Sequence, residues 1–239
     1  MDIPNLRRET IYGMPAADQL LFNRYYVLGY SYYFRQAKWA LEIVDPDRTD
    51  INRADNFHPD YRIPENFRTD LLDYAGSGYD RGHLVASANQ METQLQNSET
   101  FLLSNMSPQH PVFNRTTWKT LEERVRELNA HPKTLETFVI CGPVFYFDRP
   151  VKCIGEKDSN EVSIPIPHAY FKSVLTENNR GTLCMWSFVI PNEATTQPLA
   201  EFLVPTRLVE RLAGIKLWQR LEGRKIEREK ARIRRMWSP

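Results

Sequence analysis

The sequence predicts a mixed α+β domain in which mainly antiparallel strands pack around one central helix. Short runs of aromatic and branched residues, typical of strands, occur at 24–44, 136–147, 163–175 and 183–192. One stretch, 114–128, shows helical periodicity instead. The chain has 239 residues, of which 41% are hydrophobic, so we expect one domain with a substantial core.

The first predicted strands lie in 24–44, RYYVLGYSYYFRQAKWALEIV, where aromatic and branched residues flank a polar break. This pattern favours two paired strands. Residues 45–75 contain several prolines among polar residues and predict a long irregular connection, a kind of loop that is often functional. The run TFLLSNMSPQ, 100–109, predicts a short buried strand that ends at Pro108.

The central helix is predicted by Trp118, Leu121, Val125 and Leu128, which recur at spacings of three and four and form one apolar stripe. After the three later strands, PTRLVERLAGI predicts a short helix that ends at Gly214. The tail from Leu217 onward is helix-prone except at Gly223.

Composition excludes several classes of protein. The longest apolar runs are far too short to cross a bilayer, so we expect no membrane partner. Three widely spaced cysteines without a CxxC pair argue against a disulfide framework or a zinc site. No secretory signal is visible: the protein starts in the cytosol if Met1 is native, and otherwise is the mature form of an organellar, periplasmic or secreted protein.

Charge is distributed unevenly along the chain. The formal net charge is +1, but residues 220–239 carry eight basic and three acidic side chains. We therefore divide the chain into a main domain, 1–219, and a basic, helix-prone tail, 220–239. Because the main domain is slightly acidic, a nucleic-acid ligand would have to be held by a local basic patch.

A candidate site begins in GSGYDRGHLVASANQ, 76–90, which places Arg81 and His83 side by side. On the central helix, Asn114, Glu122 and Arg126 recur at multiples of four residues and follow one side. Two helical turns separate Asn114 from Glu122 by roughly 12 Å, too far for both to bind one ion directly. Glu122 could instead hold a metal-bound water, an arrangement that suits magnesium.

This set of residues is suited to phosphodiester hydrolysis. A neutral imidazole, His83, can remove a proton from water. A divalent cation held by Asn114 can stabilise charge on the phosphate and on the leaving oxygen. Arg81 and Arg126 can donate paired hydrogen bonds to the same phosphate.

Each residue also has a plainer interpretation. His83 alone fits a structural histidine, and Asn114 fits the N-terminal end of a helix. Glu122 and Arg126, four residues apart, fit an exposed ion pair of little energetic value. Only the combination favours a catalytic site.

The segments YDRGHLVASAN, TFLLSNMSPQ, FNRTTWKTLEERVR and VICGPVF resemble the DNA/RNA non-specific endonucleases. That family includes mitochondrial endonuclease G and secreted bacterial sugar-non-specific nucleases. The resemblance runs from about Tyr12 to about Leu217. It implies a ββα-metal (His-Me finger) fold and a hydrolase that cuts both DNA and RNA and leaves 5′-phosphate ends.

The resemblance also implies a role for each site residue. His83, in the DRGH motif, matches the general base, and Asn114 the sole direct protein ligand of Mg²⁺, with Mn²⁺ as an alternative. Glu122 matches the acidic residue that orients metal-bound water. The arginines Arg81 and Arg126 match phosphate contacts. Three further residues follow: Asn105 at a supporting, substrate-contacting position, Asp80 as a residue that fixes local geometry, and Arg115, where several relatives carry glutamine.

Other functions remain open at this point. The chain could be a catalytically silent or gated nucleic-acid-binding module, or a phosphodiesterase for a small substrate shaped by the 45–75 loop. A cytosolic nuclease would require restraint, so we expect an inhibitor or regulatory protein as a partner, with the basic tail as a docking element. Members of the family are often homodimers, so a homodimer is a further expectation.

Overall fold

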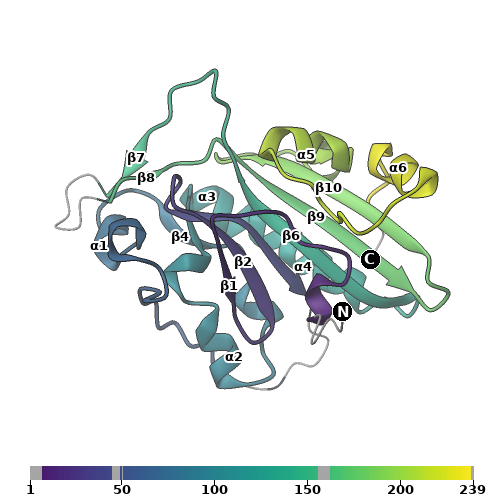
Figure 1. Ribbon diagram of the computed structural model, residues 1–239, viewed down its shortest axis with the longest axis horizontal. Coiled ribbons are helices and arrows are strands. Elements are labelled where there is room, and N and C mark those ends of the chain that lie inside the picture. The colour runs from purple at the N-terminus through teal and green to yellow at the C-terminus, as the bar shows by residue number, and fades with distance from the viewer. Residues whose placement is uncertain (1–6, 45–48, 50, 156–161, 238–239) are drawn as a thin grey trace, which may run out of the picture.

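The computed structural model describes residues 7–44, 49, 51–155 and 162–237. A seven-stranded antiparallel sheet with the order β1-β2-β3-β6-β9-β10-β11 runs through the centre (Figure 1). Its strands are Gln19–Phe22 (β1), Tyr26–Ser31 (β2), Gln36–Ile43 (β3), Thr134–Val144 (β6), Ala169–Asn178 (β9), Leu183–Pro191 (β10) and Leu203–Val204 (β11). The strand pair predicted in 24–44 is confirmed as β2–β3, and the three later strands are confirmed as β6, β9 and β10.

Two short strand pairs lie outside this sheet. Asp80–His83 (β4) pairs with Met106–Gln109 (β5), and Cys153–Ile154 (β7) pairs with Ile164–Pro165 (β8). The α-helices are Leu71–Tyr74 (α1), Gln94–Glu99 (α2), Pro111–Phe113 (α3), Lys119–Asn129 (α4), Thr206–Ala213 (α5) and Arg224–Ala231 (α6). A π-helical turn, Asn114–Trp118, joins α3 to α4. Within the described residues, no helix is long and apolar enough to cross a bilayer.

The sheet has a helix-covered core on each face. Alternate residues of a strand point to opposite sides, so Val139 packs in the cluster that contains Trp118 and Leu121 of the central helix. Its neighbour Phe138 packs in the other cluster, with Val209 of α5. Helices α3 and α4 therefore lie on one face of the sheet, and α5 lies on the other (Figure 1). The apolar stripe predicted for the central helix is fully buried, as expected.

Two predicted boundaries are wrong. The helix begins at Pro111 rather than at Asn114, because His110 caps it: its ring nitrogen accepts a hydrogen bond from the Val112 N–H. The strand in 100–109 continues through Pro108 to Gln109. A two-stranded ribbon tolerates proline because it has free edges, where the missing proline N–H costs no ladder hydrogen bond. In the tail as far as Trp237, regular helix is confined to α6, which follows Gly223 with its positive φ of 99°.

The tail packs against the domain rather than extending from it. After α6, the chain passes the edge of β10, where the Trp186 indole donates to the Arg235 carbonyl. The Trp237 indole then donates to the carbonyl of Arg124 on α4, and its ring packs edge-on against Trp186. Trp237 therefore stabilises the edge of the sheet instead of standing free as a docking side chain. The boundary at 219/220 stays a prediction.

Candidate active site

An open pocket of about 680 Å³ lies between β4, the central helix and the loop around residues 53–57. Six of the seven site residues predicted from the sequence line it: Arg81, His83, Asn114, Arg115, Glu122 and Arg126. The seventh, Asn105, is fully buried and is not among the lining residues. Its side chain bonds to the backbone of Val85 and Thr100, so it fixes the loop after β4 rather than facing a ligand.

The order of elements explains why distant residues meet here. β4 pairs antiparallel with β5, and β5 leads directly into the helix that starts at Pro111. This ββα unit places His83 alongside the helix, although 31 residues separate it from Asn114 in the sequence. Gly82 is needed in DRGH because any Cβ at that position would overlap the side chain of Gln109 on β5. The Trp118 indole donates to the His83 carbonyl at 3.2 Å, which ties β4 to the π-helical turn.

Asp80 fixes the orientation of the Asn114 amide. Asn114 Nδ2 donates to Asp80 Oδ2 at 2.9 Å, and the same carboxylate accepts two hydrogen bonds from the Arg115 guanidinium at 2.9 and 2.7 Å. These donors, with burial opposing them, hold the Asp80 pKa below its ordinary value. A carboxylate can only accept, so the amide nitrogen must face Asp80, and the amide oxygen is left for another partner. Arg115 therefore adds no unbalanced charge beside Asn114.

His83 is held as a neutral ring. Its imidazole packs edge-on against Phe57 and Phe101, with ring centroids 5.7 and 4.9 Å away. Burial, together with the positive charges of Arg53 and Arg81, lowers the His83 pKa to about 3. Nε2 is shielded from solvent and has no hydrogen-bond partner among the described residues. At neutral pH the ring is therefore unprotonated, and Nε2 is left to accept a hydrogen bond.

Glu122 is a buried carboxylate opposite a buried lysine. Lys172 Nζ, from β9, lies 3.9 Å from Glu122 Oε1 and 4.3 Å from the centre of the Trp118 ring. Burial raises the Glu122 pKa, and Lys172 opposes that rise. Glu122 Oε1 is shielded from solvent and has no hydrogen-bond partner among the described residues, although Glu122 itself lines the pocket.

A second buried carboxylate, Glu42 on β3, completes this charge cluster. It accepts hydrogen bonds from Asn89 Nδ2 at 2.9 Å and Gln90 Nε2 at 3.0 Å. Burial raises the Glu42 pKa to about 7, against the lowering effect of Lys172. Asn89 also accepts a hydrogen bond from Arg126 Nη1 at 3.0 Å, which holds this arginine at the pocket wall.

Arg53 is a site residue that the sequence did not reveal. Its guanidinium lies 5.0 Å from the centre of the Phe101 ring and lines the pocket beside Arg81, which lies 4.1 Å from the Phe57 ring centre. The only signal was its place in the long 45–75 loop, because INRADNF has no periodicity or motif. The sequence did not reveal Lys172 either, because it is a single charged residue inside a strand.

The donor set suits a cation that keeps most of its water. Within the described residues, no group of three or more His, Cys, Asp or Glu side chains could hold a metal ion. The pocket offers instead one oriented amide oxygen, on Asn114, and one carboxylate without a hydrogen-bond partner for Oε1, on Glu122. Magnesium is commonly bound in this way, through few protein oxygens and several waters.

Comparison with known proteins agrees with this fold. Residues 6–223 match the family model described as DNA/RNA non-specific endonuclease. Mitochondrial endonuclease G of Caenorhabditis elegans is 32% identical over 231 residues, covering 91% of this chain and 74% of that protein. The Bos taurus protein of the same name is 34% identical over 213 residues, covering 85% and 70%. A crystal structure of an EndoG/EndoGI complex superposes with a TM-score of 0.83 at 31% identity, covering 93% of this chain and 95% of that chain.

The fold and the pocket thus define a ββα-metal nuclease, as predicted from the sequence. The chain belongs to the DNA/RNA non-specific endonuclease family, and it is a nucleic-acid hydrolase.

Proposed function

We propose that the protein is a magnesium-dependent, sequence-non-specific endonuclease that hydrolyses DNA and RNA and leaves 5′-phosphate ends. The observation that carries the proposal is the presence, in one pocket, of a neutral His83 and an Asn114 whose amide oxygen is turned away from Asp80. One side chain can take a proton, and the other can hold a cation.

His83 acts as the general base. It accepts a proton from a water molecule whose oxygen attacks phosphorus, and the bond from phosphorus to the 3′ oxygen breaks. The departing 3′ oxygen takes up a proton from solvent water, and the phosphate remains on the 5′ end. The bound phosphate is itself negative, so it raises the His83 pKa toward a value that favours proton transfer in the occupied site.

Asn114 would hold Mg²⁺ directly, and Glu122 would hold it through water; Mn²⁺ has similar ligand preferences. When bound, the cation stabilises negative charge on the phosphate and the leaving oxygen. Lys172 keeps Glu122 charged enough to orient water inside a buried site. Arg53, Arg81 and Arg126 donate hydrogen bonds to the substrate phosphate. Arg115 does so with the N–H groups that Asp80 does not use.

Recognition through phosphates accounts for the absence of sequence preference. The polar groups of the pocket are mainly guanidinium, ammonium and carboxylate groups, which suit a phosphate rather than a base edge. Cleavage should therefore weaken steeply as salt concentration rises.

Two protein partners are proposed. The structural neighbour was solved as a complex concerning EndoG inhibition, which supports an inhibitor for this chain as well. A homodimer is supported by an apolar groove of about 620 Å³ beside β7 and β8, where Tyr33 and Phe147 are each about three-quarters exposed. Light scattering of the wild type and of a Phe147→Ser variant tests the dimer: a monomeric wild type would refute it.

The function is tested by incubating supercoiled plasmid and a structured RNA with wild type, His83→Ala and Asn114→Ala, in magnesium and in EDTA. We expect metal-dependent cutting of both substrates by wild type and near-complete loss in both variants. Binding without cutting by folded wild type would indicate a silent or gated binding module. Preferential turnover of a small diester over plasmid would indicate a phosphodiesterase.

A further inference from the structure

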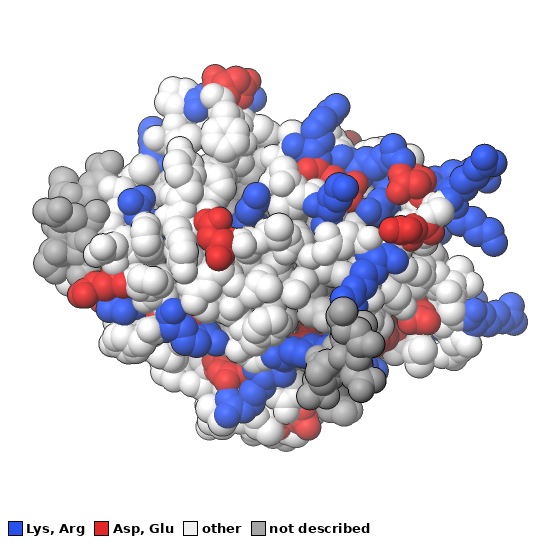
Figure 2. Space-filling model, in the orientation of Figure 1, with Lys and Arg blue, Asp and Glu red and all other residues white. Residues whose placement is uncertain are grey.

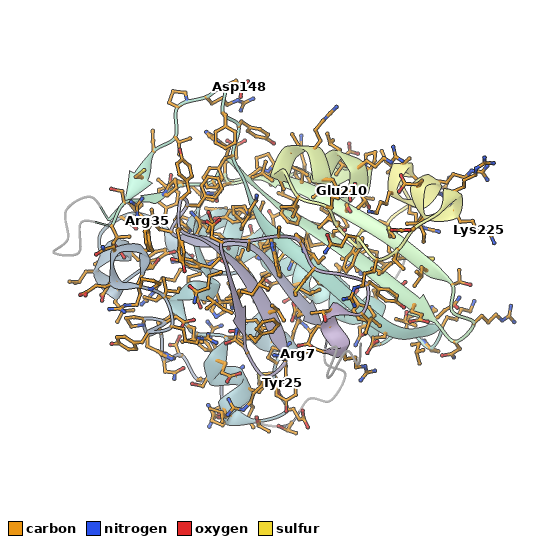
Figure 3. All side chains as sticks on the ribbon, viewed as in Figure 1. Arg7, Tyr25, Arg35, Asp148, Glu210 and Lys225 are labelled. Carbon is orange, nitrogen blue, oxygen red and sulfur yellow. The ribbon has the colours of Figure 1, made fainter. Side chains whose placement is uncertain are left out.

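A basic surface lies on the side of the sheet opposite the pocket. We call it the α5–α6 basic face and define it by six exposed side chains: Arg211, Lys216, Arg224, Lys225, Arg228 and Arg232. In Figure 2, Lys and Arg side chains gather over α5 and α6 at the upper right. Lys225 projects from the outer side of α6 (Figure 3). The pocket belongs to the α4 side of the sheet, so this face is not an extension of the site.

The positive charge of the protein is concentrated here. Residues 206–237 contain eleven basic and four acidic side chains, a net charge of +7. Since the whole chain is only +1, all remaining residues together are net −6. The remaining residues therefore provide no net attraction for a polyanion, and the α5–α6 basic face does.

The acidic residues of this region are largely neutralised within it. Glu227 pairs with Arg207, and Glu210 pairs with the buried Lys230, so both acids help to join α6 to α5. A third pair, Glu229 with Arg234, holds the segment after α6. Among the described residues, by contrast, Arg224, Lys225 and Arg228 take part in no ion pair. Their charges are directed to solvent.

The arrangement of these charges suits a phosphate backbone. Arg224 and Arg228 are one helical turn apart, roughly 6 Å along the axis. Phosphates of one DNA strand follow one another at about 3.4 Å along the duplex, so the two arginines can reach separate phosphates. α6 offers no apolar face for insertion into a membrane, because Ile226 packs against the core.

We propose that the α5–α6 basic face is a second nucleic-acid docking surface, which holds a separate segment of a long substrate while the pocket holds the bond to be cut. This proposal rests on the proposed function, which identifies the polyanion as DNA or RNA. α6 begins at residue 224, immediately after the matched family segment ends at 223, so Arg224, Lys225 and Arg228 lie outside that segment.

The proposal predicts a dependence on substrate length. DNA is stiff, with a persistence length of about 150 base pairs, so a duplex of about 12 base pairs cannot curve around the protein to reach both faces. A duplex of about 200 base pairs can reach both, through bending or through a second segment. A short duplex can therefore occupy only one of the two sites at a time, whereas a long substrate can engage both, so the surface should strengthen binding of long substrates most.

The test compares a triple variant, Arg224→Gln, Lys225→Gln and Arg228→Gln, with a control triple, Lys133→Gln, Lys152→Gln and Arg180→Gln. All six side chains are exposed, and both triples lower the net charge equally. Affinity for labelled short and long duplexes is measured in EDTA across a range of salt concentrations. Because EDTA prevents cutting, failure of the proposed function does not affect this readout. Thermal unfolding verifies the fold of each variant.

We expect the α6 triple to bind the long duplex on the order of tenfold more weakly and to lose about three units of salt slope, one for each phosphate contact. Its affinity for the short duplex should fall by a smaller factor, and its plasmid kcat should match wild type while the plasmid KM rises. Equal loss in both triples, or unchanged long-duplex binding, would overturn the proposal. Loss of binding to phosphatidylserine vesicles with unchanged DNA binding would also overturn it, in favour of a membrane surface.

Discussion

Asp80 Oδ2 and Asn114 Nδ2, 2.9 Å apart, determine which end of the Asn114 amide faces the pocket. Residues that orient a metal ligand commonly contribute 10- to 100-fold to metal affinity. We therefore expect Asp80→Ala to weaken Mg²⁺ or Mn²⁺ binding by roughly that factor, measured by calorimetric titration in the absence of substrate.

Arg115 provides the matched control for Asp80. Arg115→Gln removes the other partner of the carboxylate and leaves the bond to Asn114 in place. Its metal affinity should stay close to wild type. If both variants lose affinity equally, the charge of the cluster matters and the orientation of the amide does not.

Arg53 should act on both substrate and base. Replacing it with glutamine removes a charged phosphate donor, so we expect kcat/KM for plasmid to fall roughly 10- to 100-fold. The same change removes one of the charges that depress the His83 pKa from its ordinary 6.5 to about 3. An NMR titration should then show the His83 pKa rising while staying below 6.5, because burial remains. An unchanged His83 pKa would show that the Arg53 charge does not act on the His83 ring.

Lys172 is the counter-charge of two buried carboxylates, Glu122 and Glu42. Lys172→Met should lower the free energy of unfolding by about 3 kcal/mol near pH 8. The loss should be smaller near pH 5, where carboxyl groups with raised pKa values take up protons and no longer need a partner. Urea denaturation at both pH values measures this difference, with Lys119→Met at the pocket rim as control. A loss that is independent of pH would indicate packing alone.

Glu42 makes stability depend on pH in a defined direction. Its pKa is about 7 in the folded protein against an ordinary 4.5, so the native state binds the extra proton between these values. Its contribution to the free energy of unfolding therefore declines as pH rises from about 4.5 to about 7. Relative to wild type, Glu42→Gln should gain up to about 3 kcal/mol of stability over that range. The exposed Glu65→Gln should show no such trend, and an equal trend in both variants would contradict the assignment.

The sequence predicts those parts of the fold that have a strong apolar pattern. β2, β3 and the buried stripe of the central helix follow directly from the spacing of apolar residues. β1 was missed because it has only four residues and one buried side chain. The π-helical turn at Asn114 and the course of the tail depend on contacts such as that between Trp237 and Arg124, which no local pattern encodes.

The site divides in the same way. His83, Asn114 and Glu122 stand in motifs, and the pocket brings all three together. Arg53 and Lys172 come from a loop and from a strand, and their importance lies in three-dimensional neighbours that spacing cannot reveal. Asn105 shows the converse: it lies within a segment that resembles the family, but its amide is used entirely by the backbone around it.

The most direct test of the central claim, that His83 is the base and Asn114 the metal ligand, is chemical rescue. Plasmid cleavage by His83→Gly and by Asn114→Ala is measured with increasing imidazole at fixed magnesium. We predict that imidazole restores metal-dependent cutting to His83→Gly, since it replaces the missing ring, and has no effect on Asn114→Ala. Undiminished cutting by His83→Gly, or equal rescue of both variants, would contradict the account.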